Sequence, residues 1–165
     1  MAGPRTFEKI GADLALTGFV GTPSMVDLAS ADSWGELDLR VRPGGQGGLP
    51  QSGDVIDIAI ASGRENLAQA LLLRLLTAQG ALTPLGHPEY GSRLASLIGR
   101  LNNEQTRNLA RLYTIEAVAQ EPRVKELRAL QVETVTGQPD TIRIGFSVLP
   151  MADDDPLALA VEVTL

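Results

Sequence analysis

The sequence predicts an α+β fold, because the spacing of its hydrophobic residues changes twice along the chain. Apolar and polar residues alternate in the first sixty residues and again in the last forty, which is typical of half-buried strands. Between these regions the apolar residues recur every three or four positions, which is typical of amphipathic helices. We therefore expect N-terminal strands, a central group of three helices and a C-terminal antiparallel meander of three strands.

Residues 1–61 are predicted to form a strand-rich N-terminal extension. Two runs in it place apolar residues at every second position: Leu37, Leu39 and Val41, then Ile56, Ile58 and Ile60. The segment between them, residues 43–53, is rich in glycine and proline, which favours a loop. Either a long hairpin or a linker fits this loop, and the strand pattern on both sides favours the hairpin.

Residues 62–165 are predicted to form the second unit, with helices over about 63–121 and strands over about 127–165. Ser62 and Glu65 have the spacing of a capping box, so we expect the first helix to begin there. Gly80 is the expected end of that helix, since glycine readily adopts the left-handed cap conformation. The expected buried stripe consists of Leu67, Leu71, Leu75 and Ala78, widened by Leu72 and Leu76.

Two further helices are expected before the C-terminal strands. The second is short and places four apolar residues on one face: Leu94, Leu97, Ile98 and Leu101. Asn102 or Asn103 can cap the third helix, and Pro122 stops it because proline has no amide hydrogen. The apolar residues expected on the third helix are Leu109, Leu112, Ile115, Val118 and Ala119.

The C-terminal meander is predicted from three runs of alternating residues. The last run carries Leu157, Leu159, Val161 and Val163. This strand contains no lysine or proline that would protect an open sheet edge. A partner protein could therefore add a strand to it. Coverage of the same edge by the N-terminal strands or by a helix is an equally open alternative.

Composition and charge exclude several classes of site. The chain has no cysteine and one histidine, so we expect no metal site and no cofactor. A net charge of −6 and an aromatic content of 4% disfavour nucleic-acid binding. The longest apolar runs are far shorter than the roughly 20 residues that cross a membrane. We expect the protein to be made in the bacterial cytoplasm and to leave it only within a larger particle.

The region from Gly63 onward resembles the small baseplate-wedge family of contractile tails, whose founding phage member is gene product twenty-five. The matching segments, in chain order, are Glu65-Asn66-Leu67, Gln69-Ala70, Leu75-Leu76-Thr77 with Gly80, Pro88, Tyr90-Gly91, Leu94 and Glu121-Pro122-Arg123-Val124. Each segment is short, and their shared order and spacing carry the resemblance. At the position of the family's arginine-bearing stretch this chain has Ala81-Leu82-Thr83-Pro84.

The resemblance implies a scaffold protein without enzymatic activity. Members of this family lie in the inner baseplate of phage tails, extracellular injection systems and type VI secretion machines, in several copies around a sixfold axis. The Glu-Pro-Arg segment, here Glu121, Pro122 and Arg123, would hold the core bundle formed by the larger wedge proteins. The C-terminal strands would resemble the inner domain of the sheath protein and start the sheath. Hub and tube proteins at the axis are further partners that the resemblance leaves open.

Residue chemistry by itself gives the Glu121-Pro122-Arg123 segment a weaker interpretation. A glutamate at the carboxyl end of a helix is disfavoured by the helix dipole, so Glu121 is expected to have a cationic partner. Arg123 can bind a carboxylate with two parallel hydrogen bonds. An ion pair between these two residues of the same chain is the simpler alternative.

Two other functions fit parts of the sequence. The family has been described as lysozyme-like, and a glycosidase needs two carboxyl groups across the scissile bond. The candidates are Glu65, Glu89, Glu116 and Glu121, with Trp34 as the single tryptophan. None of these acids stands near an aromatic-rich stretch that would predict a sugar cleft. A strand-adding adaptor unrelated to injection machines is the other alternative.

Overall fold

A computed structural model describes residues 11–16, 19–22, 25–28, 39, 41–43, 56–151 and 153–165. For residues 19–22, 25–28, 41–43 and 56–57 it describes the backbone alone. The strands are β1 (Ala12–Leu14), β2 (Phe19–Thr22), β3 (Met25–Leu28), β4 (Val41–Pro43), β5 (Ile56–Ile58), β6 (Ile60–Ser62), β7 (Val124–Val135), β8 (Gln138–Pro150) and β9 (Leu157–Thr164). The helices are α2 (Arg64–Leu76), α3 (Glu104–Ala119) and two short 3₁₀ helices, η2 (Thr83–Leu85) and η3 (Leu94–Leu97).

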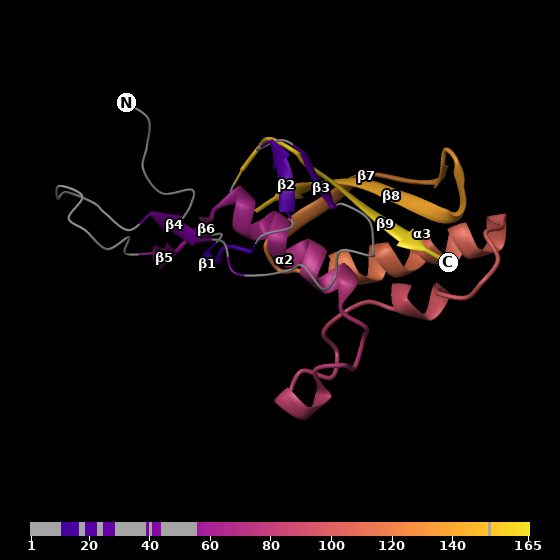
Figure 1. Ribbon diagram of the computed structural model, residues 1–165, viewed down its shortest axis with the longest axis horizontal. Coiled ribbons are helices and arrows are strands. Elements are labelled where there is room, and N and C mark those ends of the chain that lie inside the picture. The colour runs from indigo at the N-terminus through magenta and orange to yellow at the C-terminus, as the bar shows by residue number, and fades with distance from the viewer. Residues whose placement is uncertain are drawn as a thin grey trace.

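The predicted α+β class is confirmed, including the antiparallel meander of β7, β8 and β9. Figure 1 shows α2 and α3 on one side of this meander, where α3 contacts β7 and α2 contacts β9. The buried core lies between the helices and the sheet. Its largest fully buried side chains include Leu67, Leu71, Leu72, Leu97, Ile142, Ile144, Leu157, Val148 and Val161.

The sheet extends beyond the meander on the side of β9. Its strand order is β2-β3-β9-β8-β7, and β3 runs parallel to β9. The paired positions are Met25 with Ala158, Val26 with Leu159, and Asp27 with Ala160. The alternative in which N-terminal strands cover the β9 edge is therefore correct for residues 158–160. The alternative of a fully open edge is wrong, because β3 of the same chain pairs with part of the last strand.

The N-terminal extension forms two small ladders. β1 pairs with β6 and β4 pairs with β5, both antiparallel. The β4–β5 pairing agrees with the predicted hairpin, although the loop residues 44–55 and Leu37 lie outside the described part of the chain. Leu39 forms an isolated bridge with Leu16 rather than belonging to a strand.

The first helix begins at Arg64, close to its predicted start, but the predicted capping box and the predicted end are wrong. Ser62 is the last residue of β6, and Gly63 is the N-cap of α2 with no side-chain capping bond. The helix ends at Leu76, because the backbone of Thr77 turns to an extended conformation, with φ −78° and ψ 128°. The amide and hydroxyl of Thr77 both donate to the Leu73 carbonyl, at 2.9 and 2.7 Å. Gly80 lies in the turn that follows. The predicted buried stripe is confirmed for the leucines at 67, 71, 72 and 75.

The second predicted helix is only the 3₁₀ helix η3. Leu94 and Leu97 are buried in it as expected, whereas Ile98 and Leu101 are 66% and 81% exposed. A single 3₁₀ turn cannot present four residues on one face over eight positions. The prediction of an apolar face that includes Ile98 and Leu101 is therefore wrong.

The third helix is confirmed, and Asn103 is its cap. The Asn103 Oδ1 accepts a hydrogen bond from the Thr106 amide at 2.8 Å. Its buried face, however, consists mainly of small residues: Thr106, Ala110, Thr114, Ala117 and Val118. Leu112 and Ile115 are each 45% exposed, so the prediction that they face the core is wrong. In the part of the chain that the structure describes, no helix is long and apolar enough to span a membrane.

Candidate functional site

Residues from three separate segments meet where α2 and α3 end. Arg74 comes from the last turn of α2, Tyr90 from the loop that returns to η3, and Glu121 and Arg123 from the turn after α3. We call these four residues the Glu121 network. Three of its members belong to the segments that carry the family resemblance: Tyr90, Glu121 and Arg123. Arg74 was not identified, although it is a lone charge within an otherwise apolar run, and that was its one visible signal.

Glu121 is the centre of this network and is buried, with 5% of its surface exposed. Its Oε1 accepts a hydrogen bond from the Arg123 Nε at 2.6 Å. Its Oε2 lies 3.6 Å from the Arg74 Nη2. The predicted cationic partner of Glu121 is therefore present within the chain, and there are two of them. The simpler alternative, an ion pair between Glu121 and Arg123, is correct in that the two side chains are in contact. The pair does not lie at the surface, however, because the Glu121 side chain is buried.

Arg74 joins the two helix ends. Its guanidinium carbon lies 4.6 Å from the centre of the Tyr90 ring, a cation–π distance. Its Nη1 donates to the Gln120 Oε1 at 3.3 Å. Its Nε is buried and finds no acceptor among the described residues. An unpaired buried N–H opposes folding, so this arrangement has a cost that the ion pair with Glu121 offsets.

The local charges alter two pKa values. Burial raises the pKa of Glu121, but the hydrogen bond and charge of Arg123, together with the charge of Arg74, outweigh burial and hold it below the ordinary value. Burial raises the pKa of Tyr90, an effect that the Arg74 charge opposes without cancelling. Both groups are therefore in their usual forms at neutral pH, with Glu121 ionised and Tyr90 neutral.

The depressed pKa of Glu121 predicts a pH dependence of stability. The unfolded chain takes up the Glu121 proton at a higher pH than the folded chain does, so protonation favours unfolding. The stabilisation is complete above the ordinary pKa of 4.5 and is lost as pH falls through the lower folded value. Urea denaturation between pH 3 and pH 7 should show this loss at the acidic end. In Glu121→Gln the loss should be smaller, and an unchanged profile would contradict the assignment.

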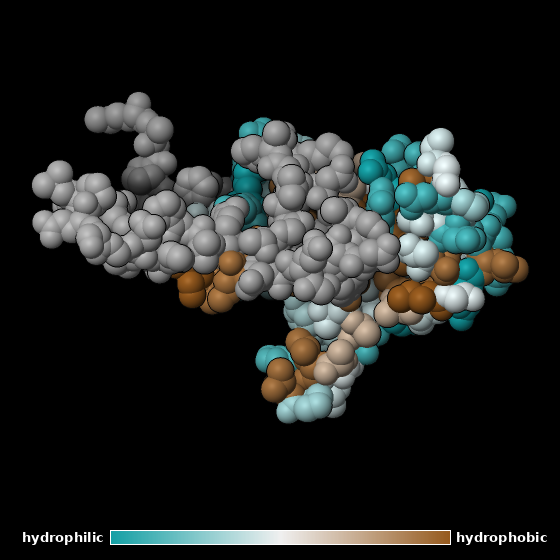
Figure 2. Space-filling view, in the orientation of Figure 1, coloured by the Kyte–Doolittle hydropathy of each residue, from teal (hydrophilic) through white to brown (hydrophobic). Residues whose placement is uncertain are grey.

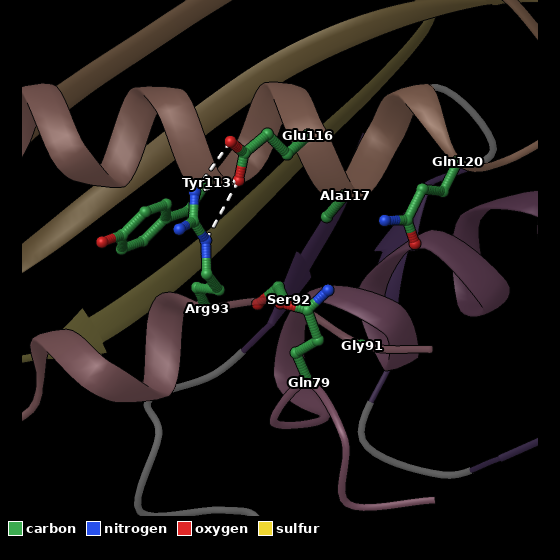
Figure 3. Close-up of a pocket in the computed structure, with 8 residues that line it drawn as sticks. All are labelled: Gln79, Gly91, Ser92, Arg93, Tyr113, Glu116, Ala117 and Gln120. Atoms are coloured by element: carbon green, nitrogen blue, oxygen red, sulfur yellow. Dashed lines mark hydrogen bonds and ion pairs between the residues drawn. The ribbon is translucent and has the colours of Figure 1, made fainter. Parts of the chain in front are cut away.

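A second polar cluster lies next to this network, in a cleft of about 470 Å³ between α3 and the segment that leads into η3. Figure 3 shows the Arg93 side chain between the Tyr113 ring and the Glu116 carboxylate. Arg93 Nε and Nη2 bind Glu116 at 3.1 and 2.5 Å, and the guanidinium carbon is 4.3 Å from the Tyr113 ring centre. Gln120 lines this cleft and also bonds Arg74, so it connects the two clusters.

The loop of residues 77–91 projects from the body of the protein, as Figure 1 shows. The amide of Ser92 donates to the Thr77 carbonyl and the amide of Gln79 to the Ser92 carbonyl, each at 2.8 Å, and these bonds close its base. Gly91 lies at this base with a φ of +106°. Tyr90, the residue before Gly91, contacts Arg74 of the Glu121 network. The conformation of the loop base and the geometry of the network therefore depend on one another.

The remaining predicted site residues lie in different settings. Pro122 is exposed in the turn after α3, and the Arg123 side chain is 26% exposed beside it. Leu157, Leu159, Val161 and Val163 all face the core and are 8% exposed or less. A partner at β9 would therefore meet backbone groups rather than these side chains. No group of three or more potential metal-ligating side chains gathers within the described ranges.

Comparison with known proteins supports the fold. No protein-family model matches the chain, and no curated protein sequence matches it. Among solved structures, the chain is similar to a Geobacter sulfurreducens protein that carries the provisional name of tail lysozyme. The two share 21% identity with a TM-score of 0.55, over 64% of this chain and 93% of the other. At this identity the likeness establishes a shared fold with a tail-associated protein.

Proposed function

We propose that this protein is a structural subunit of the inner baseplate of a contractile injection machine. It would join the wedge core bundle to the first layer of sheath, in several copies around a sixfold baseplate. The supporting observation is that two separate segments of the sequence resemblance, one with Tyr90 and the other with Glu121 and Arg123, meet in one network. The fold shared with a tail-associated protein supports the same conclusion. Assembly would take place in the bacterial cytoplasm, and the subunit would then belong to the particle.

The geometry suggests different roles for the two charged residues of the Glu121-Pro122-Arg123 segment. Glu121 is buried, so it cannot be the group that a partner contacts. Its carboxylate instead orients the Arg123 guanidinium through the bond to Nε. The Arg123 side chain is 26% exposed, so a partner protein could reach its guanidinium. Arg123 would therefore bind an acidic side chain of the core bundle, and Pro122 would fix the direction of the turn.

Arg123→Ala is expected to abolish co-purification with the wedge core-bundle proteins while the subunit stays folded. The reason is that this change removes the bidentate contact, while Arg74, 3.6 Å from the buried Glu121 carboxylate, remains to compensate its charge. Affinity purification from the producing cells, with circular dichroism of the isolated variant, measures both effects. Electron micrographs of the same cells should show particles without sheath.

Arg128→Ala provides a matched control for this experiment. Arg128 is an arginine of β7 that is also paired with a glutamate, Glu126, at 3.2 Å, and both side chains are 50% exposed. It should leave co-purification unchanged. Wild-type recovery of the core-bundle proteins by Arg123→Ala would refute the proposed role of the segment.

The sheath contact that this function requires would form at the outer edge of β9. Within the described residues, β3 pairs with 158–160 and leaves 161–164 without a strand on that side. A short sheath strand could add its backbone hydrogen bonds there. A longer strand would need the place that β3 occupies, so its addition would require β2 and β3 to move.

Peptidoglycan hydrolysis is a second candidate, favoured by the provisional name of the structural neighbour. A glycosidase acid needs a raised pKa, whereas the pKa of Glu121 is lowered. Glu116 lies in a cleft but is held by three hydrogen bonds from Arg93. We expect purified protein to leave the turbidity of a cell-wall suspension unchanged. Clearing that disappears in Glu116→Gln or Glu121→Gln would favour the enzyme instead.

A further inference from the structure

β9 keeps its place in the sheet by contacts that do not involve β3. It pairs with β8 along its whole length, from Leu157 to Thr164, in one unbroken register. Just before β9, the Arg64 guanidinium binds the Asp153 carboxylate at 2.6 Å and the Pro156 carbonyl at 2.7 Å, which fixes this turn to the start of α2. Loss of β3 would therefore leave β9 in position and expose its backbone edge.

The β2–β3 hairpin is held to the sheet by less. β3 pairs with β9 only at residues 158–160, and parallel pairing is slightly less stable per residue than antiparallel pairing. The main contacts of β2 and β3 are with each other and with β9 (Figure 1). A two-stranded hairpin by itself is only marginally stable in water. We therefore expect both strands to detach together when the β3–β9 pairing breaks.

The chain just before this hairpin is fixed to the body of the protein. The Gln69 side chain of α2 donates to the Leu14 carbonyl at 2.8 Å and accepts from the Leu16 amide at 3.0 Å. The adjoining β1–β6 ladder has a small buried cluster, which consists of Ala15, Ala59 and Ala61. Sequence alternation predicts a buried isoleucine face here, yet Ile58 and Ile60 are 38% and 57% exposed. A detached hairpin would stay attached to the subunit through β1.

The two outer strands of the meander, β7 and β9, are protected in different ways. β7 has three shifts of register against β8, and its exposed charged residues are Lys125, Glu126, Arg128 and Glu133. Figure 2 shows mainly hydrophilic colour over the end of the sheet where β7 and β8 meet in Figure 1. Bulges and charges discourage the addition of a further strand. β9 has a regular register and one charged residue, Glu162, which Arg143 of β8 binds at 2.9 Å, so its edge depends on β3 for protection.

The part of the β9 edge that β3 leaves uncovered is short. It consists of residues 161–164, whereas a typical strand has about five or six residues. A partner strand of that length would also pair with 158–160, the positions that β3 occupies.

We propose that the β2–β3 hairpin is a releasable cap on the sheath-binding edge of β9. The proposal rests on the proposed function, in which a strand of the sheath protein pairs with this edge. In the free subunit β3 blocks residues 158–160, and the sheath strand displaces β3 and pairs with 158–164. The sheath protein binds the open state, so its affinity is reduced by the fraction of subunits in which the cap is closed.

Hydrogen–deuterium exchange of the purified full chain tests whether the cap opens by itself. The amides of residues 25–28 should exchange at least about 100-fold faster than those of the β8–β9 ladder, because local opening costs less than global unfolding. Equal protection of β3 and β8 would overturn the proposal, since β3 would then leave β9 only when the whole protein unfolds.

A disulfide across the β3–β9 pairing tests whether opening is needed for binding. Asp27 and Ala160 are paired positions on adjacent strands, about 4.8 Å apart, and a disulfide spans Cα separations of about 4.4–6.8 Å. The chain has no cysteine, so Asp27→Cys with Ala160→Cys introduces a single bridge. The oxidised variant should bind purified sheath protein at least about tenfold more weakly than the reduced variant.

Thr141→Cys with Thr164→Cys is the matched control. These residues pair across β8 and β9 with their hydroxyl oxygens 3.2 Å apart, and strand addition does not change that pairing. Its oxidised and reduced forms should bind sheath protein equally. Equal binding by both forms of the β3–β9 variant, or a bridge that does not form, would refute the cap while the sheath contact stands. A wild type that binds no sheath protein would instead refute the sheath contact of the proposed function, and the cap with it.

Discussion

Glu121→Gln should lower the free energy of unfolding by about 3 kcal/mol, the lower end of what breaking a buried ion pair costs. The change keeps the size of the side chain and removes its charge. Arg74 and Arg123 would then face each other across a neutral group, with side chains only 13% and 26% exposed. Urea denaturation followed by far-UV circular dichroism at pH 7 gives the difference.

Glu116→Gln is the matched control, because Glu116 is also a glutamate near the end of α3 with an arginine partner. The Glu116 and Arg93 side chains are both 44% exposed, so solvent screens their pairing. We expect this change to cost less than about 1 kcal/mol. Equal losses in the two variants would show that burial of Glu121 does not determine the strength of its network.

Gly91→Ala should destabilise the protein by about 3 kcal/mol or more and should disorder the base of loop 77–91. A Cβ at this position would lie 2.6 Å from the Thr77 carbonyl oxygen and 2.9 Å from backbone atoms of Ala78. These are backbone atoms, so they cannot rotate away as a side chain could. The φ of +106° adds a strain that alanine does not tolerate well.

Thermal unfolding of Gly91→Ala and Gly86→Ala separates the two causes. Gly86 also has a positive φ, +85°, but a Cβ there would meet nothing within 4 Å. Its substitution should cost about 1 kcal/mol, from the left-handed backbone alone. A Gly91→Ala melting temperature as high as that of Gly86→Ala would show that the loop base accommodates the methyl group. The Arg74–Tyr90 contact would also weaken in Gly91→Ala, since Tyr90 is the adjacent residue.

Local chemistry made parts of the fold predictable. Asn103 caps α3 because its side chain can reach the Thr106 amide in any helix that begins there. The meander of β7, β8 and β9 was predictable because apolar and polar residues alternate along each strand, as they do in any sheet with one covered face. The end of α2 was missed because the backbone of Thr77, three residues before the glycine, already turns to an extended conformation, with φ −78° and ψ 128°.

The candidate site was predictable in its residues but not in its arrangement. A glutamate at the carboxyl end of a helix is expected to have a cationic partner, and Arg123 lies only two residues after Glu121 in the sequence. The second cation, Arg74, is 47 positions earlier in the chain, and only the packing of α2 against α3 brings it within 3.6 Å. Burial of Glu121, which prevents it from contacting a partner directly, likewise depends on that packing.

The sequence alone determined the α+β class, the positions of the main helices and the C-terminal strands, and the segment that ends in Glu121-Pro122-Arg123. These follow from hydrophobic period and from caps that act within a few residues. The tertiary structure decided that β3 covers β9, that Ile60 and Leu112 face outward, and that Arg74 completes the Glu121 network. A repeating pattern shows that a strand or helix has two faces. Which face is buried depends on the element that packs against it, and that element can come from any part of the chain.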